Sequence, residues 1–381
     1  MSSLRVAFVT DYLSNLAGTE SSIVATCQML RQAGDEVLVF CYSEEGTVHQ
    51  HWRSLLEKAS VRLIHQPAES QPGGIPADVF CKSIADFLRI WKPHLIHAIP
   101  LGPFGLSWIN SGLLPNVPTI GTETSAANDR CSWYDPTTFA SYARYKAIIA
   151  TSNTVCTGIR SFFGYKGNVP VIPSIVPIKE DEMTPLTPED LLHVHSLGSI
   201  SRLRVEKGPE FMVAALSILA LDYPKVTLTI YGETPELERT CQVAQALGVA
   251  NRLFLPGPFR GAIEIDQVIR RHCIFLLPSI FEGLPLSLLE VIARGRVVVA
   301  SDVGAVSEIF ESTSAGLVVP PGNPQAVAEA VASLLADLPN VIDRGKTGIR
   351  RFRERYHVDV VFPALRNFYL EIARVAIHTG K

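Results

Sequence analysis

Glu282 and Glu290 lie eight residues apart in the stretch PSIFEGLPLSLLEVIARG, residues 278–295, and the second stands among apolar residues. Pro285 predicts a helix that begins near Leu284, because the missing N–H of a proline is not needed in the first helical turn. The helix that follows is apolar on nearly every side, so Glu290 is expected to be buried, which is costly for an unpaired carboxylate. Two interpretations of Glu290 stay open: its two acceptor oxygens suit the vicinal diol of a ribose, or it forms a salt bridge with Arg294 at i+4.

Two loops between strands and helices could hold an anion. Before the apolar helix, Gly283 lets a ligand approach the main chain, and free N–H groups at the helix start carry partial positive charge. In GSISRLRVEKGPEF, residues 198–211, Arg202 and Lys207 lie in the other loop. A helix N-terminus alone contributes about 0.3–2 kcal/mol, so two cations are needed to clamp a diphosphate and stabilise its departure. The alternatives are a solvated basic loop and, for Glu282, an ordinary exposed loop residue.

The elements that must position these residues alternate between strand and helix patterns in both halves of the chain. In the first half, LRVAFVTDYL, KPHLIHAIP, VPTIGTETS and YKAIIATSN predict strands of a buried parallel sheet. In the second half, the alternation runs from residues 191–200 to residues 324–337. A proline-rich acidic segment at 178–190 predicts a solvated linker between two doubly wound α/β domains. Ligands of such sheets bind beyond the carboxyl ends of the strands, so the loops there should carry the chemistry.

Length, composition and charge narrow the class of protein. With 381 residues, 47% hydrophobic and 19% charged, the chain suits two ordered domains. The net charge of −3 disfavours a general nucleic-acid binder. No apolar run reaches the roughly 18 residues that span a bilayer, and the chain opens on a strand pattern, so a cytoplasmic protein is expected. Seven scattered cysteines and ten histidines show no metal-ligand spacing, so we predict no metal site.

Four segments of the second half keep the order and spacing of a known family: SRLRVEKG, FLLPSIFEGLPLSLLEVIARG, VVASDVGAVSEI and AGLVVPPGNPQAVAEA. Across residues 196–335 the chain resembles the nucleotide-sugar half of retaining glycosyltransferases of the GT-B fold, family 4. The resemblance implies two Rossmann-like domains that face each other across a deep cleft. Residues 1–178 would bind the acceptor and residues 179–357 the donor, with a C-terminal helix from about 358 to 381 crossing back to the first domain.

The same resemblance assigns roles in the donor half. Glu290 would hold the nucleotide ribose, and Glu282 would lie beside the transferred sugar. Arg202 and Lys207 would hold the diphosphate of a UDP-linked donor. Backbone amides of the segment Gly283, Leu284, Pro285 and Leu286 would help. The expected reaction is metal-independent, needs no cofactor, and moves a hexose-type sugar to a hydroxyl of a glycan, a lipid-linked acceptor or a small molecule.

The first half resembles the family more loosely. In AGTE, Gly18 stands where the family has a glycine pair, and it would approach the diphosphate and the sugar from the first domain. In VPTIGTETSA, where many members have a histidine, this chain has Thr124 with Glu123 beside it. Retaining transfer does not require the histidine, because the leaving phosphate can accept the acceptor's proton on the same face of the sugar. Glu123 and Thr124 are therefore acceptor-side candidates, with Glu123 expected to assist.

Other functions remain open at this level. A nucleotide-sugar epimerase of the same fold would form product with no acceptor present. A non-catalytic subunit would bind nucleotide sugars without transferring or hydrolysing them, and the departures in the first half are of the kind that a decayed acceptor site would show.

A membrane surface is a further candidate partner. HQHWRSLLEKAS and IADFLRIWKPH, residues 49–60 and 84–94, mix tryptophan, leucine and basic residues. Such stretches fit peripheral contact with the inner face of a membrane, as a lipid-linked acceptor would require. Amphipathic helices packed on a sheet explain them equally well.

Overall fold

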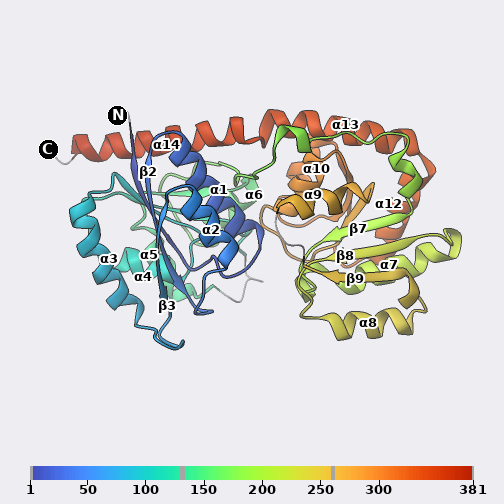
Figure 1. Ribbon diagram of the computed structural model, residues 1–381, viewed down its shortest axis with the longest axis horizontal. Helices are drawn as coiled ribbons and strands as arrows, with labels where there is room; N and C mark the ends of the chain where they lie inside the picture. Colours follow the sequence, from blue (N-terminus) through green and yellow to red (C-terminus); the bar gives the residue numbers. More distant parts are fainter. Residues whose placement is uncertain (1–2, 129–133, 259–261, 380–381) are drawn as a thin grey trace. The chain divides into compact units, whose positions relative to one another are not determined.

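The computed structural model describes residues 3–128, 134–258 and 262–379 (Figure 1). The chain forms two compact units: Met1–Pro177 together with Val358–Lys381 is unit 1, and Ile178–His357 is unit 2. Each unit contains a six-stranded parallel sheet covered by helices, which confirms the predicted α/β fold class.

Unit 1 is built on a sheet with the strand order β3-β2-β1-β4-β5-β6. Its strands are β1 (Arg5–Thr10), β2 (Glu36–Ser43), β3 (Arg62–Pro67), β4 (Leu95–Ala98), β5 (Thr119–Glu123) and β6 (Ala147–Ala150). One face packs on α1 (Gly18–Gln32), α2 (Gln50–Lys58) and α14 (Val358–Thr379). The other face packs on α3 (Ala77–Trp91), α4 (Pro103–Ser111) and α6 (Asn153–Ser161), while the short α5 (Phe139–Tyr142) precedes β6.

Unit 2 repeats this arrangement, with the order β12-β11-β10-β7-β8-β9. Its strands are β7 (Ser196–Ile200), β8 (Thr227–Tyr231), β9 (Leu253–Gly257), β10 (Ile274–Leu277), β11 (Val297–Ser301) and β12 (Gly316–Val319). Its helices are α7 (Pro209–Asp222), α8 (Leu237–Ala246), α9 (Ala262–Arg270), α10 (Leu286–Ala293), α11 (Val306–Thr313), α12 (Pro324–Ala336) and α13 (Leu338–Arg355). In both sheets the strand order reverses between the first and fourth strands of the unit, which are parallel neighbours, and such a switch point is where α/β sheets bind ligands.

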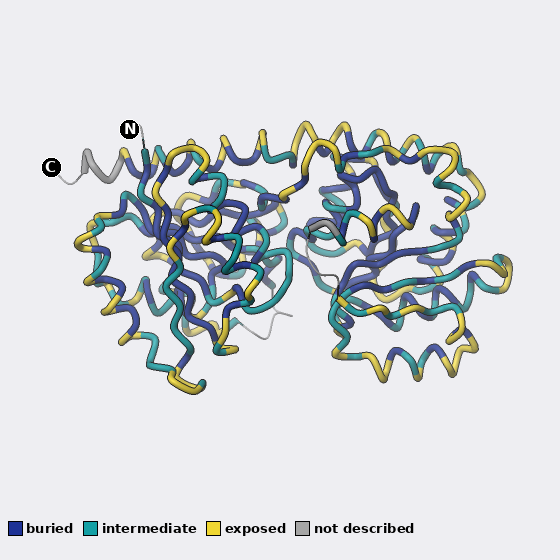
Figure 2. Tube along the Cα trace, in the orientation of Figure 1, coloured by how far each residue is buried: buried dark blue, intermediate teal, exposed yellow. Residues whose placement is uncertain are grey.

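Burial explains why apolar runs became central strands. Every residue of β4, β5, β6, β10 and β11 is buried, and Figure 2 shows buried tube along the sheets with exposed residues on the outer faces of the helices. Full burial of a valine, leucine or isoleucine side chain contributes about 1.5–3 kcal/mol, so runs such as VVVAS in β11 stabilise the sheet strongly. No helix in the described part of the chain is long and apolar enough to cross a lipid bilayer.

The acidic segment after Ile178 differs from its prediction as a solvated linker. Glu180 and Asp181 are exposed, but Glu182 is half-buried. Glu180 forms an ion pair with Arg353 of α13, and Glu182 forms one with Arg294 at the end of α10. The segment is therefore held to unit 2 by charge pairing, which its composition alone could not reveal.

Candidate functional site

The carboxyl edge of the unit 2 sheet carries most of the predicted site residues. After β10, residues 278–285 form a loop, and α10 begins at Leu286 with Pro285 as its N-cap. The helix therefore starts two residues later than the predicted start near Leu284. Gly283, Leu284 and Leu286 donate no backbone hydrogen bond to any described residue, so their N–H groups at this helix start remain open to a ligand.

Two glycines let neighbouring loops close on this one. Gly208 has a φ of +65°, and a Cβ there would lie 2.3 Å from the carbonyl oxygen of Pro278. A Cβ at Gly304, after β11, would lie 2.3 Å from the carbonyl oxygen of Glu282. Backbone hydrogen bonds of 2.9 Å join the Ile280 N–H to the loop after β7 and the Ala305 N–H to the Gly283 carbonyl. The loops after three strands thus meet at Glu282. A side chain in place of Gly208 or Gly304 would collide with the loop backbone and prevent this approach.

Glu282 is buried and paired, so its interpretation as an ordinary exposed residue is wrong. Its side chain is 6% exposed, and its Oε1 lies 2.7 Å from the Nζ of Lys207. The hydroxyl of Ser279, which is fully buried, donates to the same oxygen at 2.7 Å. Lys207 is thus the counter-ion of Glu282 before any ligand binds. Ser279 was missed from the sequence, because a serine after a strand carries no signal of its own.

Arg202 lies on the same loop as Lys207, just after β7. It is half-buried, and its guanidinium donates no hydrogen bond to any residue that the structure describes. Arg204, by contrast, is exposed. A half-buried arginine with unused donors is a ready partner for a phosphate, since its planar fork matches two phosphate oxygens.

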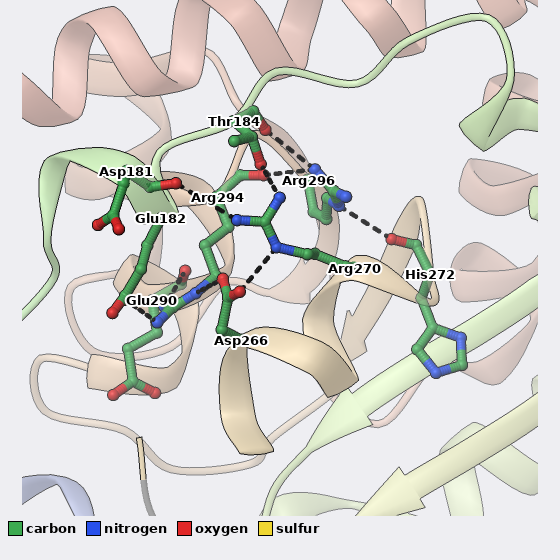
Figure 3. A network of polar contacts seen from close by, with 9 residues as sticks. All are labelled: Asp181, Glu182, Thr184, Asp266, Arg270, His272, Glu290, Arg294 and Arg296. Carbon is green, nitrogen blue, oxygen red and sulfur yellow. Dashed lines mark hydrogen bonds and ion pairs between the residues drawn. The ribbon is translucent and has the colours of Figure 1, made fainter. Parts of the chain in front are cut away.

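Glu290 lies in the second turn of α10, half-buried among apolar residues. Burial raises the pKa of its carboxyl to about 7; the positive charge of Arg294 opposes this rise and the negative charge of Glu182 adds to it. In Figure 3 the carboxylate points away from the ion pairs around it. No described residue donates a hydrogen bond to it, so its oxygens can accept hydrogen bonds from a ligand with hydroxyl groups.

Arg294 does not form the salt bridge with the Glu290 carboxylate that was the alternative interpretation. Its guanidinium forms ion pairs with Glu182 and with Asp266, the latter at 3.1 Å. Its remaining contact with Glu290 is a hydrogen bond of 3.1 Å from Nη1 to the backbone carbonyl. The helical spacing was right for a contact, but the partners lie on segments distant in the sequence.

The unit 1 candidates lie at the carboxyl edge of their own sheet. Gly18 is the first residue of α1, and the N-cap Ala17 offers no side chain to the free N–H groups there. Glu123, the last residue of β5, is 2% exposed, and burial raises the pKa of its carboxyl to about 7. Its Oε1 accepts hydrogen bonds from the backbone N–H groups of Thr124 at 2.9 Å and Ser125 at 2.8 Å. Thr124 is half-buried beside it.

Asp11 is a further carboxylate at this edge, and it was not among the residues selected from the sequence. It follows β1, and its Oδ1 accepts a hydrogen bond of 2.8 Å from the N–H of Phe104, in the first turn of α4. Burial raises the pKa of its carboxyl to about 7, an effect that the N–H of Phe104 opposes and the charge of Glu44 reinforces. A Cβ at Gly102 would collide with its Oδ2, so this glycine makes room for the carboxyl group.

One pocket of unit 1 is lined by other residues than these. A cavity of about 800 Å³ is lined by Thr119 and Lys146, at the amino ends of β5 and β6, and by parts of α4 and α5. None of the predicted site residues lines it. Among the described residues, no group of three His, Cys, Asp or Glu side chains is placed to hold a metal ion.

Two family models match the chain, one for each half. The model of glycosyl transferases group 1 matches residues 195–349, and that of glycosyltransferase family 4 matches residues 16–180. The first match contains Arg202, Lys207, Glu282 and Glu290, and the second contains Gly18 and Glu123.

Curated relatives match over part of their length. The chain is 27% identical over 224 residues to the GDP-mannose-dependent alpha-(1-6)-phosphatidylinositol monomannoside mannosyltransferase of Mycobacterium tuberculosis, a match that covers 55% of this chain and 57% of that protein. It is 28% identical over 170 residues to the lipopolysaccharide core biosynthesis mannosyltransferase LpcC of Rhizobium leguminosarum, covering 43% and 47%. The chain thus spans about half the length of the curated relatives it matches.

A solved structure matches over nearly the whole chain. HepE of Anabaena, in complex with UDP, superposes with a TM-score of 0.80 at 17% sequence identity, covering 97% of this chain and 100% of that one. At this identity the likeness concerns the fold, which is that of GT-B glycosyltransferases.

Proposed function

Because the chain belongs to the family 4 glycosyltransferases of the GT-B fold, we propose that it transfers a hexose-type sugar from a nucleoside-diphosphate donor to an acceptor hydroxyl with retention of configuration. The observation that carries the proposal is Glu290, a half-buried carboxylate that accepts no hydrogen bond from the described residues. A ribose diol supplies two donors to such a group, and the same burial that raises the pKa of Glu290 makes those bonds strong.

The diphosphate is assigned to the loop after β7 and to the start of α10. Arg202 has unused donors, and Lys207 lies 2.7 Å from Glu282. When a diphosphate binds, Lys207 shares its charge between the phosphate and Glu282, and the N–H groups of Gly283, Leu284 and Leu286 add fixed dipoles. The proposal assigns stabilisation of the leaving diphosphate to Arg202 and Lys207. It includes no metal ion and no cofactor.

Retention follows from a reaction on one face of the sugar. The bond from the anomeric carbon to the diphosphate breaks, a bond to the acceptor oxygen forms, and the acceptor's proton passes to the leaving phosphate. Glu282 lies beside the sugar in this scheme, held by Ser279 and Lys207. Glu123 assists from unit 1: with a pKa of about 7, its carboxyl can accept or donate a hydrogen bond to the acceptor. Unchanged turnover in Glu123→Gln would remove this assisting role.

The donor is proposed to be a UDP-linked sugar. UDP is bound in the structure of HepE, which shares the fold, whereas the mycobacterial relative is named for GDP-mannose. The acceptor is proposed to be a glycan, a lipid-linked sugar or a small molecule, and a lipid-linked acceptor would require contact with a membrane surface. Flotation with anionic vesicles tests that contact. Protein that stays entirely in the lower fractions would contradict binding to the membrane surface.

The first experiment is equilibrium binding of UDP, GDP, ADP and CMP, each with and without excess EDTA. The proteins are wild type, Glu290→Ala and the control Glu311→Ala, whose glutamate is exposed on α11. We expect EDTA-insensitive binding of one nucleotide, weakened about 10-fold in Glu290→Ala, or about 1.4 kcal/mol, and unchanged in the control. Equal nucleotide affinity in wild type and Glu290→Ala would contradict the proposed role of Glu290 in ribose binding. Nucleotide binding with neither transfer nor donor hydrolysis would favour a non-catalytic subunit.

A further inference from the structure

Arginines from several elements of unit 2 hold the segment 180–184, the first part of the chain in that unit (Figure 3). The backbone carbonyl of Asp181 and the Thr184 hydroxyl accept hydrogen bonds from Arg270, at 3.4 and 2.7 Å. The backbone carbonyl of Thr184 accepts one of 3.1 Å from Arg296. Glu180 and Glu182 add their ion pairs with Arg353 and Arg294.

Arg294 is the member of this group that reaches Glu290. Its side chain is 3% exposed, and its three nitrogens serve three different segments. One contacts Glu182 in the segment 180–184, one contacts Asp266 of α9, and one donates to the Glu290 carbonyl at 3.1 Å. A buried guanidinium with two carboxylate partners has a fixed position, so the main chain of α10 at Glu290 is tied to the segment.

In the described part of the chain, two charged side chains act on the Glu290 carboxylate. Arg294 faces it from its own helix and Glu182 from the segment 180–184, while Asp266 of α9 acts through Arg294. Gly348 of α13 lies against Ile292 of α10, and Gly345 and Ile349 lie against Gly295 just after the helix, so these contacts bring no charge. β11, which also packs on α10, has the sequence VVVAS. Among the residues that the structure describes, Arg294 and the carboxylate of Glu182 therefore have the largest electrostatic effect on Glu290.

We propose that Arg294 is a positioning residue for donor binding, which fixes Glu290 in α10 and, through Glu182, makes nucleotide affinity depend on how the segment 180–184 is docked. The inference rests on the proposed role of Glu290 in binding ribose. A ribose diol donates to the charged carboxylate, so whatever favours that charge favours the nucleotide. Glu182 neutralises part of the charge of Arg294, and undocking of Glu182 would leave more of it to act on Glu290.

The test is the pH dependence of UDP or GDP affinity in wild type, Glu182→Gln and Arg294→Gln. Affinity should rise as the pH passes through about 7, where Glu290 loses its proton. Glu182→Gln should move this midpoint to lower pH and Arg294→Gln should move it to higher pH. A shift of half a unit changes affinity below the midpoint about 3-fold. Titration of the nucleotide phosphate is common to all variants, so only the differences between them count.

Arg351→Gln is the matched control, because it removes an arginine of α13 whose exposed ion pair is with Glu354 of the same helix, and it should leave the midpoint unmoved. Glu182→Gln keeps the shape of the side chain, so its shift stays readable if Arg294→Gln folds poorly. In parallel, carboxyl carbon NMR of glutamate-labelled protein follows the titration of Glu290 directly, with its signal identified by Glu290→Gln. The same opposite shifts are expected there.

The outcomes separate the two proposals. A wild type that binds no nucleotide overturns the proposed function, whatever the NMR titration shows. Nucleotide binding that requires Glu290, with the same midpoint in Glu182→Gln and Arg294→Gln and no shift of the carboxyl signal, overturns the positioning role alone. Shifts of both variants in the same direction would also overturn it, because loss of packing has no reason to follow the sign of the deleted charge.

Discussion

The two sheets have the same strand order, yet their carboxyl edges carry different charges. In unit 2, Arg202 and Lys207 bring positive charge, and the carboxylate of Glu282 is paired with Lys207. In unit 1, Asp11 and Glu123 are carboxyl groups held mainly by backbone N–H groups, and burial raises the pKa of each to about 7. One edge is thus prepared for an anion, and the other for neutral polar groups.

This difference shows that the fold determines where the loops lie, while the residues on the loops determine which ligand can bind. The diphosphate of a donor needs cations, which only the unit 2 edge supplies among these candidates. An acceptor hydroxyl needs a group that can both donate and accept near neutral pH, which a carboxyl with a pKa near 7 can do. Variants that change one edge test this difference, when turnover, nucleotide affinity and stability are all measured.

The largest effect is expected for Lys207→Met. Loss of one group that stabilises developing negative charge lowers turnover about 100- to 1000-fold, or roughly 3–4 kcal/mol, and here it also leaves Glu282 buried without its counter-ion. Steady-state transfer rates measure it, beside a melting curve to confirm folding. Arg204→Met removes an exposed cation from the same loop and should change little. Equal losses in both variants would mean that the loop merely supplies net charge.

Glu123→Gln should stabilise unit 1 at high pH. Its folded pKa of about 7 lies above the ordinary value of 4.5, so the protonated form favours folding, and this contribution is lost as the pH rises from 4.5 through 7. At about pH 8 the amide should regain at most about 3 kcal/mol, raising Tm by roughly 5–10 °C, with little change at about pH 5. Glu57→Gln, exposed on α2, is the control. A Tm gain independent of pH would contradict a buried titrating carboxyl.

Ser279→Ala should have a smaller effect, and on the unit 2 edge alone. The lost hydrogen bond to a charged carboxylate is worth about 1.5 kcal/mol, so turnover should fall roughly 10-fold with nucleotide affinity nearly unchanged. Ser333→Ala is the control, since that hydroxyl bonds only to a carbonyl of its own helix. If affinity falls as much as turnover, Ser279 acts on the loop as a whole and not on Glu282.

Many strands could be predicted from the sequence, because each is a short apolar run with turn residues on both sides. α11 and β12 were missed, although Val306, Ile309, Phe310 and Thr313 show the spacing of a helix face. The N-cap of α11, Ala305, has no side chain that could signal a helix start. Local patterns therefore found elements that have both apolar periodicity and residues that mark their ends, and missed α11, which has the periodicity alone.

The site was predicted as residue types and not as pairs. Lys207 and Glu282 were selected separately from their loops, but no local rule joins two residues 75 positions apart. The contact between Glu182 and Arg294 spans 112 positions, and it decides whether Glu290 is paired or free. Which buried carboxylate keeps its counter-ion is a property of tertiary packing, so the two interpretations of Glu290 could not be separated earlier.

The smallest effect is expected for Tyr369→Phe, which tests how α14 is attached within unit 1. The Tyr369 hydroxyl lies 2.6 Å from Nδ1 of His97, whose Nε2 lies 2.6 Å from the hydroxyl of Thr122, next to Glu123. Burial lowers the pKa of His97 to about 3, so the imidazole is neutral near neutral pH. The variant should lose about 1 kcal/mol, or roughly 2–4 °C in Tm, equally at about pH 6 and pH 8, with nucleotide affinity unchanged. A loss that varies with pH in this range would show that His97 titrates there, and the contrast with the pH-dependent Glu123 would fail.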